Sequence, residues 1–167
     1  MKKQVLDFDC DYNLMLFAIS CHQPDYKICS QINQVLGLQL EKEFPLSIKL
    51  ENFVDDFLFS YFQFFDDDHQ LNYQLISNKS YNFVQQIEKI NSLPVQQNLF
   101  LEAESTGKIS YFIPELQSFD YLFVVRCVYN LKNATKIEKS IQEIIDVNKI
   151  NYIEIKELDS KDNLIWE

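Results

Sequence analysis

Apolar residues recur along this chain at two spacings, one typical of strands and one typical of helices. Tyr12 to Ser20 forms a short, almost continuously apolar run, as expected of a central strand that is buried on both faces. A helix is predicted directly after it, because Pro24 suits the first helical position, Gly37 supplies a C-cap, and apolar residues recur between them at helical spacing. These apolar residues are Ile28, Ile32, Val35 and Leu36.

The most aromatic part of the chain, Phe57 to Phe65, predicts one half of a hairpin. The polar residues Asp66 to Gln70 follow it, and Leu71 to Ile76 is a second β-prone run that can pair with the first. Leu46 to Leu50 gives a weaker strand upstream. The aromatic strand carries apolar side chains on both faces, so either the protein covers both faces itself or one face meets another protein. Phe57, Phe59, Tyr61 and Phe65 lie on one face, and Leu58, Phe62 and Phe64 lie on the other.

The pattern between residues 80 and 113 predicts a short helix followed by a second hairpin. The helix would begin near Ser80 and end before Pro94. Two β-prone runs, Leu99 to Ala103 and Ile109 to Ile113, then flank a polar link that contains Gly107. The apolar face of the helix would consist of Phe83, Val84, Ile87 and Ile90.

The last third of the chain contains the clearest helix signal. A strand is expected from Tyr121 to Val128, and Thr135 and Glu138 then form a capping box at the start of a helix. Asn151 to Leu158 alternates as an edge strand does, and residues 159–167 read as a polar tail. Four isoleucines of the helix should face one way, namely Ile137, Ile141, Ile144 and Ile145.

This order of elements predicts a single globular domain over residues 1–167 of the α+β class. A strand and helix open the domain, a strand, helix and strand close it, and hairpins lie between them. We expect a mixed, mostly antiparallel sheet with the helices packed on one face, for which the ferredoxin-like split βαβ is the nearest named arrangement.

The segment Ile109 to Val128 is the centre of this organisation, because there an apolar run meets a proline corner and then re-enters an apolar strand. Its middle reads Ile113-Pro114-Glu115, then three residues, then Phe119-Asp120-Tyr121. This spacing resembles the signature of the IPExxxVDY family of bacterial proteins, with Phe119 in place of valine. The order of elements over about residues 11–158 is also similar to that family. The resemblance implies a bacterial protein but brings no activity, ligand or catalytic residue.

The same residues predict a structural corner without any family. Proline fixes φ and lacks an N–H group, so Pro114 suits the first position of a short helical turn, with Glu115 beside the positive end of its dipole. Leu116 and Phe119 would share one face of that turn. Asp120 can accept backbone N–H bonds where the turn gives way to the next strand.

A functional interpretation of the corner is the alternative. Glu115, Asp120 and Tyr121 could line a pocket or a partner surface with Pro114, because paired carboxylates near a phenol can serve as acid, base or ligand. Arg126, the only arginine, lies in the following apolar strand and needs a partner there, for which Glu115 or Glu104 is a candidate. These residues are the candidate binding residues, and none is assigned a catalytic role.

Composition narrows the classes of function. The net charge of −10 disfavours nucleic acid and anionic membrane as partners, because both present phosphate to a binding protein. With only Gly37 and Gly107, the chain lacks the glycines of a phosphate-cradling loop, so no nucleotide cofactor is expected. No apolar window is long enough for a membrane span, and the acids that follow Met1-Lys2-Lys3 do not fit a secretory signal.

Metal and nucleophile signals are weak. Asp66 to His69 contains ligand types, but adjacent acids without calcium-loop spacing read better as a solvated turn, so no metal is expected. Cys21 and His22 would point to opposite sides of an extended strand, which is poor geometry for a nucleophile and its base. The four cysteines show no paired spacing and are expected to be reduced in a cytoplasmic protein.

The sequence alone identifies no activity, and it leaves open whether the protein is an enzyme while favouring a non-catalytic role. The preferred hypothesis is a cytoplasmic interaction or regulatory protein that binds another protein, or a second copy of itself as a homodimer, through its sheet. The alternatives are a small enzyme or a small-ligand-binding module that uses Glu115, Asp120 and Tyr121.

Overall fold

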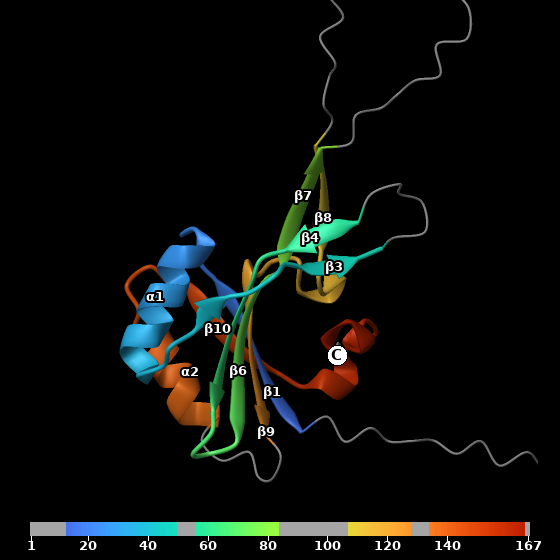
Figure 1. Cartoon of the computed structure of the whole chain (residues 1–167). Helices are drawn as coiled ribbons and strands as arrows, with labels where there is room; N and C mark the ends of the chain where they lie inside the picture. The colour runs from blue at the N-terminus through green and yellow to red at the C-terminus, as the bar shows by residue number, and fades with distance from the viewer. Residues whose placement is uncertain (1–12, 50–55, 84–106, 128–133, 166–167) are drawn as a thin grey trace, which may run out of the picture.

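The fold is built on a six-stranded sheet, and all of its described strand pairs are antiparallel (Figure 1). The computed structural model describes residues 13–49, 56–83, 107–127 and 134–165. The strand order is β10-β1-β9-β6-β5-β2. In chain order these strands are β1 (Leu14–Ser20), β2 (Glu41–Lys42), β5 (Tyr61–Asp66), β6 (Leu71–Ser77), β9 (Tyr121–Cys127) and β10 (Lys149–Ile153).

The four strands β10-β1-β9-β6 have the order and directions of the ferredoxin-like split βαβ arrangement. β9 is antiparallel to both β1 and β6, so β1 and β6 run the same way with β9 between them. By the same reasoning β9 and β10 run the same way with β1 between them. Helix α1 (Asp25–Leu36) lies in the chain between β1 and β6, and α2 (Ala134–Gln142) lies between β9 and β10. The predicted α+β class is therefore confirmed.

Both α-helices pack on one face of the sheet, as predicted (Figure 1). Ile28 and Ile32 of α1 and Ile141 of α2 are fully buried against sheet residues such as Phe17 and Phe123. Gly37 ends α1 in the left-handed conformation, with φ of 66°, which an L side chain rarely adopts. Pro24 occupies the cap position just before the helix rather than its first turn.

The other face is covered by two hairpins and three short 3-10 turns (Figure 1). One hairpin joins β3 (Leu46–Ile48) to β4 (Phe57–Phe59), and the other joins β7 (Lys79–Phe83) to β8 (Gly107–Tyr111). The hydroxyl of Ser80 donates to the carbonyl of Leu58 at 2.7 Å, which ties β7 to β4. The turns are η1 (Pro114–Leu116), η2 (Ile155–Glu157) and η3 (Lys161–Leu164).

The aromatic run predicted as one strand is divided at Ser60 into β4 and β5, which belong to different sheets. Phe57, Phe59 and Tyr61 still point to the hairpin side, and Phe62 points to the helix side. The protein itself therefore covers both faces over most of this run. The exceptions are Leu58 and Phe65, which are exposed.

The predicted helix from Ser80 is wrong in its described part, because Lys79–Phe83 is the strand β7. Its partner is β8, the strand that includes Ile109. The prediction failed because a short β-prone run with alternating polar residues fits both the helical and the strand spacing. The remainder of the predicted helix and the strand at residues 99–103 lie outside the described residues.

The C-terminal region differs from expectation in four places. The strand expected from Asn151 to Leu158 is Lys149–Ile153, and Ile155–Glu157 is the 3-10 turn η2. Thr135 lies inside α2 rather than at its cap, since the helix begins at Ala134. Ile145 follows the end of the helix and is 97% exposed, so it does not share the buried face of Ile141. The segment expected as a polar tail contributes Leu164, which is fully buried under the sheet.

Within the described residues, no helix combines the length and the apolar character that crossing a membrane requires.

Candidate functional site

The proline corner has the local geometry that the sequence predicts. Pro114 is the first residue of the 3-10 turn η1, and Ile113 precedes it in an extended conformation. Leu116 and Phe119 are both buried on the hairpin side of the sheet. Leu116 N–H donates to Ile113 at 3.0 Å, and Phe119 N–H donates to Leu116 at 2.9 Å, so two successive turns carry the chain into β9.

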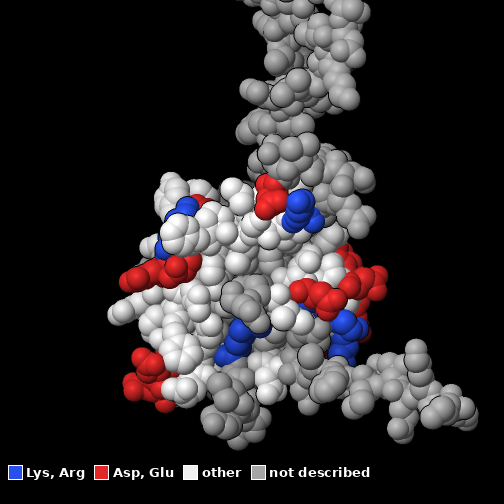
Figure 2. Space-filling view, turned by 45° about the vertical axis from the view of Figure 1, so that its right-hand side comes forward, with Lys and Arg blue, Asp and Glu red and all other residues white. Residues whose placement is uncertain are grey.

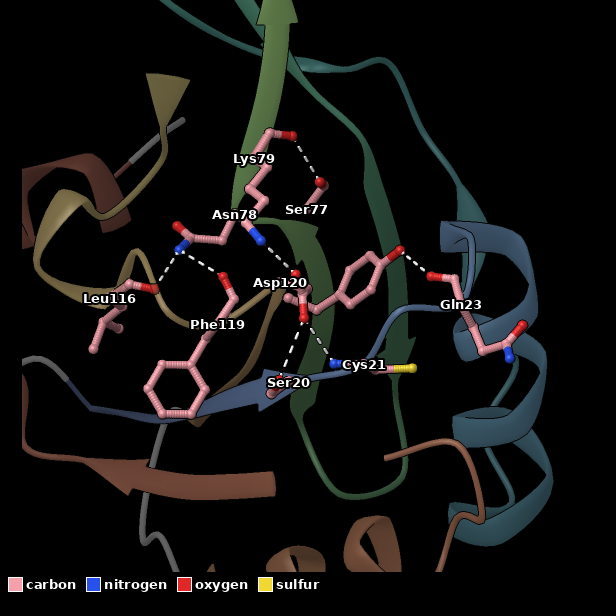
Figure 3. Close-up of polar contacts among 10 residues, drawn as sticks. Ser20, Cys21, Gln23, Ser77, Asn78, Lys79, Leu116, Phe119 and Asp120 are labelled. Atoms are coloured by element: carbon pink, nitrogen blue, oxygen red, sulfur yellow. Dashed lines mark hydrogen bonds and ion pairs between the residues drawn. The ribbon is translucent and has the colours of Figure 1, made fainter. Parts of the chain in front are cut away.

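Asn78 holds this corner in place, and sequence reasoning did not single it out. Its side chain is fully buried and donates from Nδ2 to the carbonyls of Leu116 and Phe119 at 2.8 and 3.2 Å (Figure 3). Its Oδ1 accepts the N–H of Ile113 at 2.9 Å. An amide offers donors and an acceptor together, so this one side chain bonds both to carbonyls and to an N–H group of the turn. The only sequence signal was a polar residue between two β-prone runs.

Asp120 joins the corner to the end of β1 and to β7 (Figure 3). Its Oδ2 accepts the backbone N–H of Cys21 at 2.9 Å, and its Oδ1 lies 2.6 Å from Nζ of Lys79. The two side chains of the ion pair are mostly buried, with 14% of Asp120 and 28% of Lys79 exposed. Asp120 therefore accepts a backbone N–H as predicted, but from Cys21, which directly follows β1 and is distant in sequence.

Tyr121 points to the helix side of the sheet, opposite to the corner. Its hydroxyl donates to the carbonyl of Gln23 at 2.6 Å, just before α1 begins. Burial raises the pKa of Tyr121 well above its ordinary value, and the carboxylate of Asp25 adds to this shift. The phenol is therefore neutral and serves as a donor to the backbone.

Glu115 bonds to the C-terminal segment. Its carboxylate accepts the backbone N–H of Ser160 at 2.7 Å and also accepts the hydroxyl of Ser160. Desolvation raises the pKa of Glu115, but these hydrogen bonds outweigh it and leave the pKa below its ordinary value. Glu115 is exposed, so this contact fastens the segment 159–165 to the corner from outside.

Arg126 has partners other than those suggested by the sequence. Its Nε donates to Oε1 of Gln74 at 2.7 Å, and a terminal nitrogen donates to the carbonyl of Leu164. The suggested partner Glu115 bonds to Ser160 instead, and Glu104 lies outside the described residues. Arg126 thus lies near the end of β9, whereas the corner precedes the start of that strand.

The structure does not bring Glu115, Asp120 and Tyr121 together around one cavity. Asp120 and Tyr121 bond to Cys21 and Gln23 in the link between β1 and α1, whereas Glu115 bonds to Ser160 in the C-terminal segment. All three contacts connect segments that are distant in sequence. This arrangement favours the structural interpretation of the corner over a catalytic one.

The weaker candidates also have structural explanations. Asp66 accepts the backbone N–H groups of Asp68 and His69 and contacts the His69 ring at 2.8 Å, which shapes the β5–β6 turn. Cys21 is buried whereas His22 is exposed, and burial raises the pKa of the Cys21 thiol. Within the described ranges, no group of three or more His, Cys, Asp or Glu side chains could hold a metal ion.

No family model, curated protein or solved structure matches this chain.

Proposed function

We propose that this protein is a non-catalytic cytoplasmic protein that binds a polypeptide at the edge of its sheet, with a second copy of the chain as the partner. The observation that carries this proposal is the position of β10. This strand of five residues ends the six-stranded sheet and, among the described strands, pairs with β1 alone. An edge strand offers N–H and C=O groups to a further strand.

The edge is a better candidate than either face. The helix side is covered by α1 and α2, and much of the other side is covered by the hairpins and 3-10 turns. Figure 2 shows acidic and basic side chains in small separate groups, with uncharged surface between them. Recognition through the backbone N–H and C=O groups of β10 does not require a large surface patch of one charge.

The side chains of β10 suit a second copy of the same strand. Tyr152 is 45% exposed, and its ring packs edge-on against the ring of Phe17, with 5.6 Å between the ring centroids. It therefore presents an aromatic ring at the edge whose position is held by this contact. Lys149 stands at the start of the strand, and Glu154 follows its end. In an antiparallel pair the Lys149 end of one copy lies toward the Glu154 end of the other, which is favourable for both charges.

Light scattering at micromolar concentration tests the proposal. We expect a dimer that Tyr152→Lys dissociates, because the substitution places two like charges at the paired edges. Leu58→Lys is the matched control, since Leu58 is also a partly exposed strand residue, at 57%, but lies on β4 in the other layer. A monomer at all concentrations, or equal dissociation by both substitutions, would contradict the proposal.

The salt dependence of binding distinguishes a second copy of the chain from a basic partner. Two copies each carry a formal charge of −10, so screening should strengthen their association. A basic partner would instead bind more weakly as salt rises. If the protein is monomeric and binds a basic protein more weakly as salt rises, that basic protein is the partner in place of a second copy.

A further inference from the structure

On the side that faces the hairpins, the sheet is apolar at one end of its central strands, here called the upper part. At the other end, here called the lower part, the same side is polar and forms what we call the floor. In the upper part this side carries Leu16, Ile76 and Leu122, which are fully buried under the hairpins and turns. In the lower part the same side carries polar residues of three neighbouring strands. These are Gln63 of β5, Asn72 and Gln74 of β6, and Arg126 of β9.

A chain of hydrogen bonds connects these polar side chains. Arg126 Nε donates to Gln74 Oε1 at 2.7 Å, and Gln74 Nε2 donates to the Tyr61 hydroxyl at 2.9 Å. The Tyr61 hydroxyl then donates to Gln63 Oε1 at 2.7 Å. Gln74 is only 3% exposed. The chain of bonds fixes the orientation of each amide, so the floor presents polar groups in defined positions.

This floor forms the base of a pocket of about 480 Å³. The pocket size lies within the range typical of small-molecule sites. One wall is the segment Glu43 to Leu46, which supplies apolar Phe44, Pro45 and Leu46 together with the acidic residue Glu43. Phe44 is 91% exposed, so it stands beside the pocket as an apolar side chain that the protein core does not use. Arg126 and Asn72 line the pocket from the floor.

Asn72 is the residue that folding does not explain. Its Oδ1 is buried and has no hydrogen-bond partner among the described residues. A buried acceptor without a donor destabilises a folded protein. Asn72 lies directly opposite Arg126 in the pairing of β6 with β9. A ligand donor that reached this oxygen, next to the guanidinium, would satisfy it.

We propose that this pocket binds a free α-amino acid with an apolar side chain. The guanidinium of Arg126, which already donates to Gln74 and Leu164, is a group of five N–H donors that suits a carboxylate. The acceptors Asn72 and Glu43 suit the neighbouring ammonium group, and Phe44, Pro45 and Leu46 suit the apolar side chain. The proposal is independent of the dimer, because the pocket lies over β9, β6 and β5 while β10 forms the opposite edge of the sheet.

Calorimetric titration of the full chain with L-leucine tests the proposal. We expect saturable binding at millimolar or lower concentration. The same titration with 4-methylpentanoate, which lacks the ammonium, and with L-leucinamide, which lacks the carboxylate, should show affinities at least about tenfold lower. Absence of saturable L-leucine binding to the folded protein, or equal affinity for the three compounds, would overturn the proposal.

Substitution of the unpartnered acceptor gives a second test. Asn72→Leu should weaken L-leucine binding about tenfold, yet leave the melting temperature unchanged or higher because a buried polar atom is removed. Gln31→Leu is the matched control, since Gln31 Oε1 of α1 is also buried and without a partner among the described residues. Undiminished binding by Asn72→Leu, or an equal loss of binding by both variants, would show that the pocket does not use Asn72.

Discussion

Asp120 accepts the backbone N–H of Cys21 at 2.9 Å, across a separation of 99 residues in the chain. This bond joins the end of β1 to the start of β9, and the ion pair with Lys79 adds β7 to the same point. Three strands from separate parts of the sequence are therefore fixed by one carboxylate. The corner that contains Asp120 serves the topology of the sheet.

Asp120→Ala should lower the free energy of unfolding by about 1–3 kcal/mol, because the Cys21 N–H and the largely buried Lys79 side chain both lose their bond to this carboxylate. Pro114→Ala should also destabilise the fold, and Glu115→Gln should cost less than Asp120→Ala because Glu115 is exposed. Urea unfolding measures all three. Asp68→Ala, at an exposed position, is the control and should change stability by less than about 0.5 kcal/mol. Wild-type stability in Asp120→Ala would refute the structural role.

Asn78→Ala should be the most damaging substitution at the corner, with a loss above about 3 kcal/mol, since it removes three buried hydrogen bonds at once. The carbonyl of Phe119 and the N–H of Ile113 lose this partner, and the carbonyl of Leu116 keeps only the N–H of Phe119. Asn78→Asp should be similarly harmful. It keeps the acceptor for Ile113 but replaces the donor to Leu116 and Phe119 with a second oxygen. Asn148→Ala, an exposed asparagine, is the control for thermal melting. If Asn78→Asp melted as the wild type does, the assigned amide orientation would be wrong.

Tyr121→Phe should cost about 0.5–1.5 kcal/mol, because it removes the hydroxyl that donates to Gln23 while keeping the ring. Tyr152→Phe, which alters an exposed hydroxyl, should be close to neutral. Chemical unfolding of the two variants side by side measures the difference. An equal effect would mean that the Tyr121 hydroxyl contributes nothing to the fold.

Acid should weaken the fold partly through Asp25. Desolvation raises the pKa of Asp25, but hydrogen bonds from Ser60 at 2.5 Å and from the Tyr26 N–H, with Lys42 nearby, leave the pKa below its ordinary value. In the acid range the unfolded chain therefore binds more protons at this site than the folded chain. The stabilisation is present above the unfolded pKa of about 3.9 and is lost as pH falls through the folded pKa.

Removal of these interactions should flatten the acid limb of the stability profile. We expect Asp25→Asn to abolish its share of the pH dependence, and Ser60→Ala to reduce that share by removing a donor to the carboxylate. Unfolding free energies measured from pH 7 downward provide the comparison. A profile in Asp25→Asn that fell as steeply as that of the wild type would exclude Asp25 as a contributor.

Local sequence patterns correctly predicted the elements whose apolar residues follow a single spacing, either that of a strand or that of a helix. The continuous apolar run of β1, the spacing of Ile28 and Ile32 in α1, and the proline at the start of η1 are all as expected. Each depends on neighbours within a few residues. The predicted α+β class follows from the order of such elements.

Several of the errors and omissions concern contacts between distant segments. The bend at Ser60 separates β4 from β5 because the two strands pair with different partners, which no local pattern records. The roles of Asn78 and Gln74 also depend on residues about 40 or 50 positions away. Arg126 was expected to need a partner, but its pairing with a neutral amide follows from strand order alone.

Amide hydrogen exchange of β10 tests the proposed binding edge most directly. If a second copy adds a strand there, amides of Lys149–Ile153 should exchange more slowly as protein concentration rises through the micromolar range, while those of Leu71–Ser77 inside the sheet should not change. Tyr152→Lys should remove this dependence. Exchange of β10 that is the same at every concentration in the wild-type protein would contradict the account.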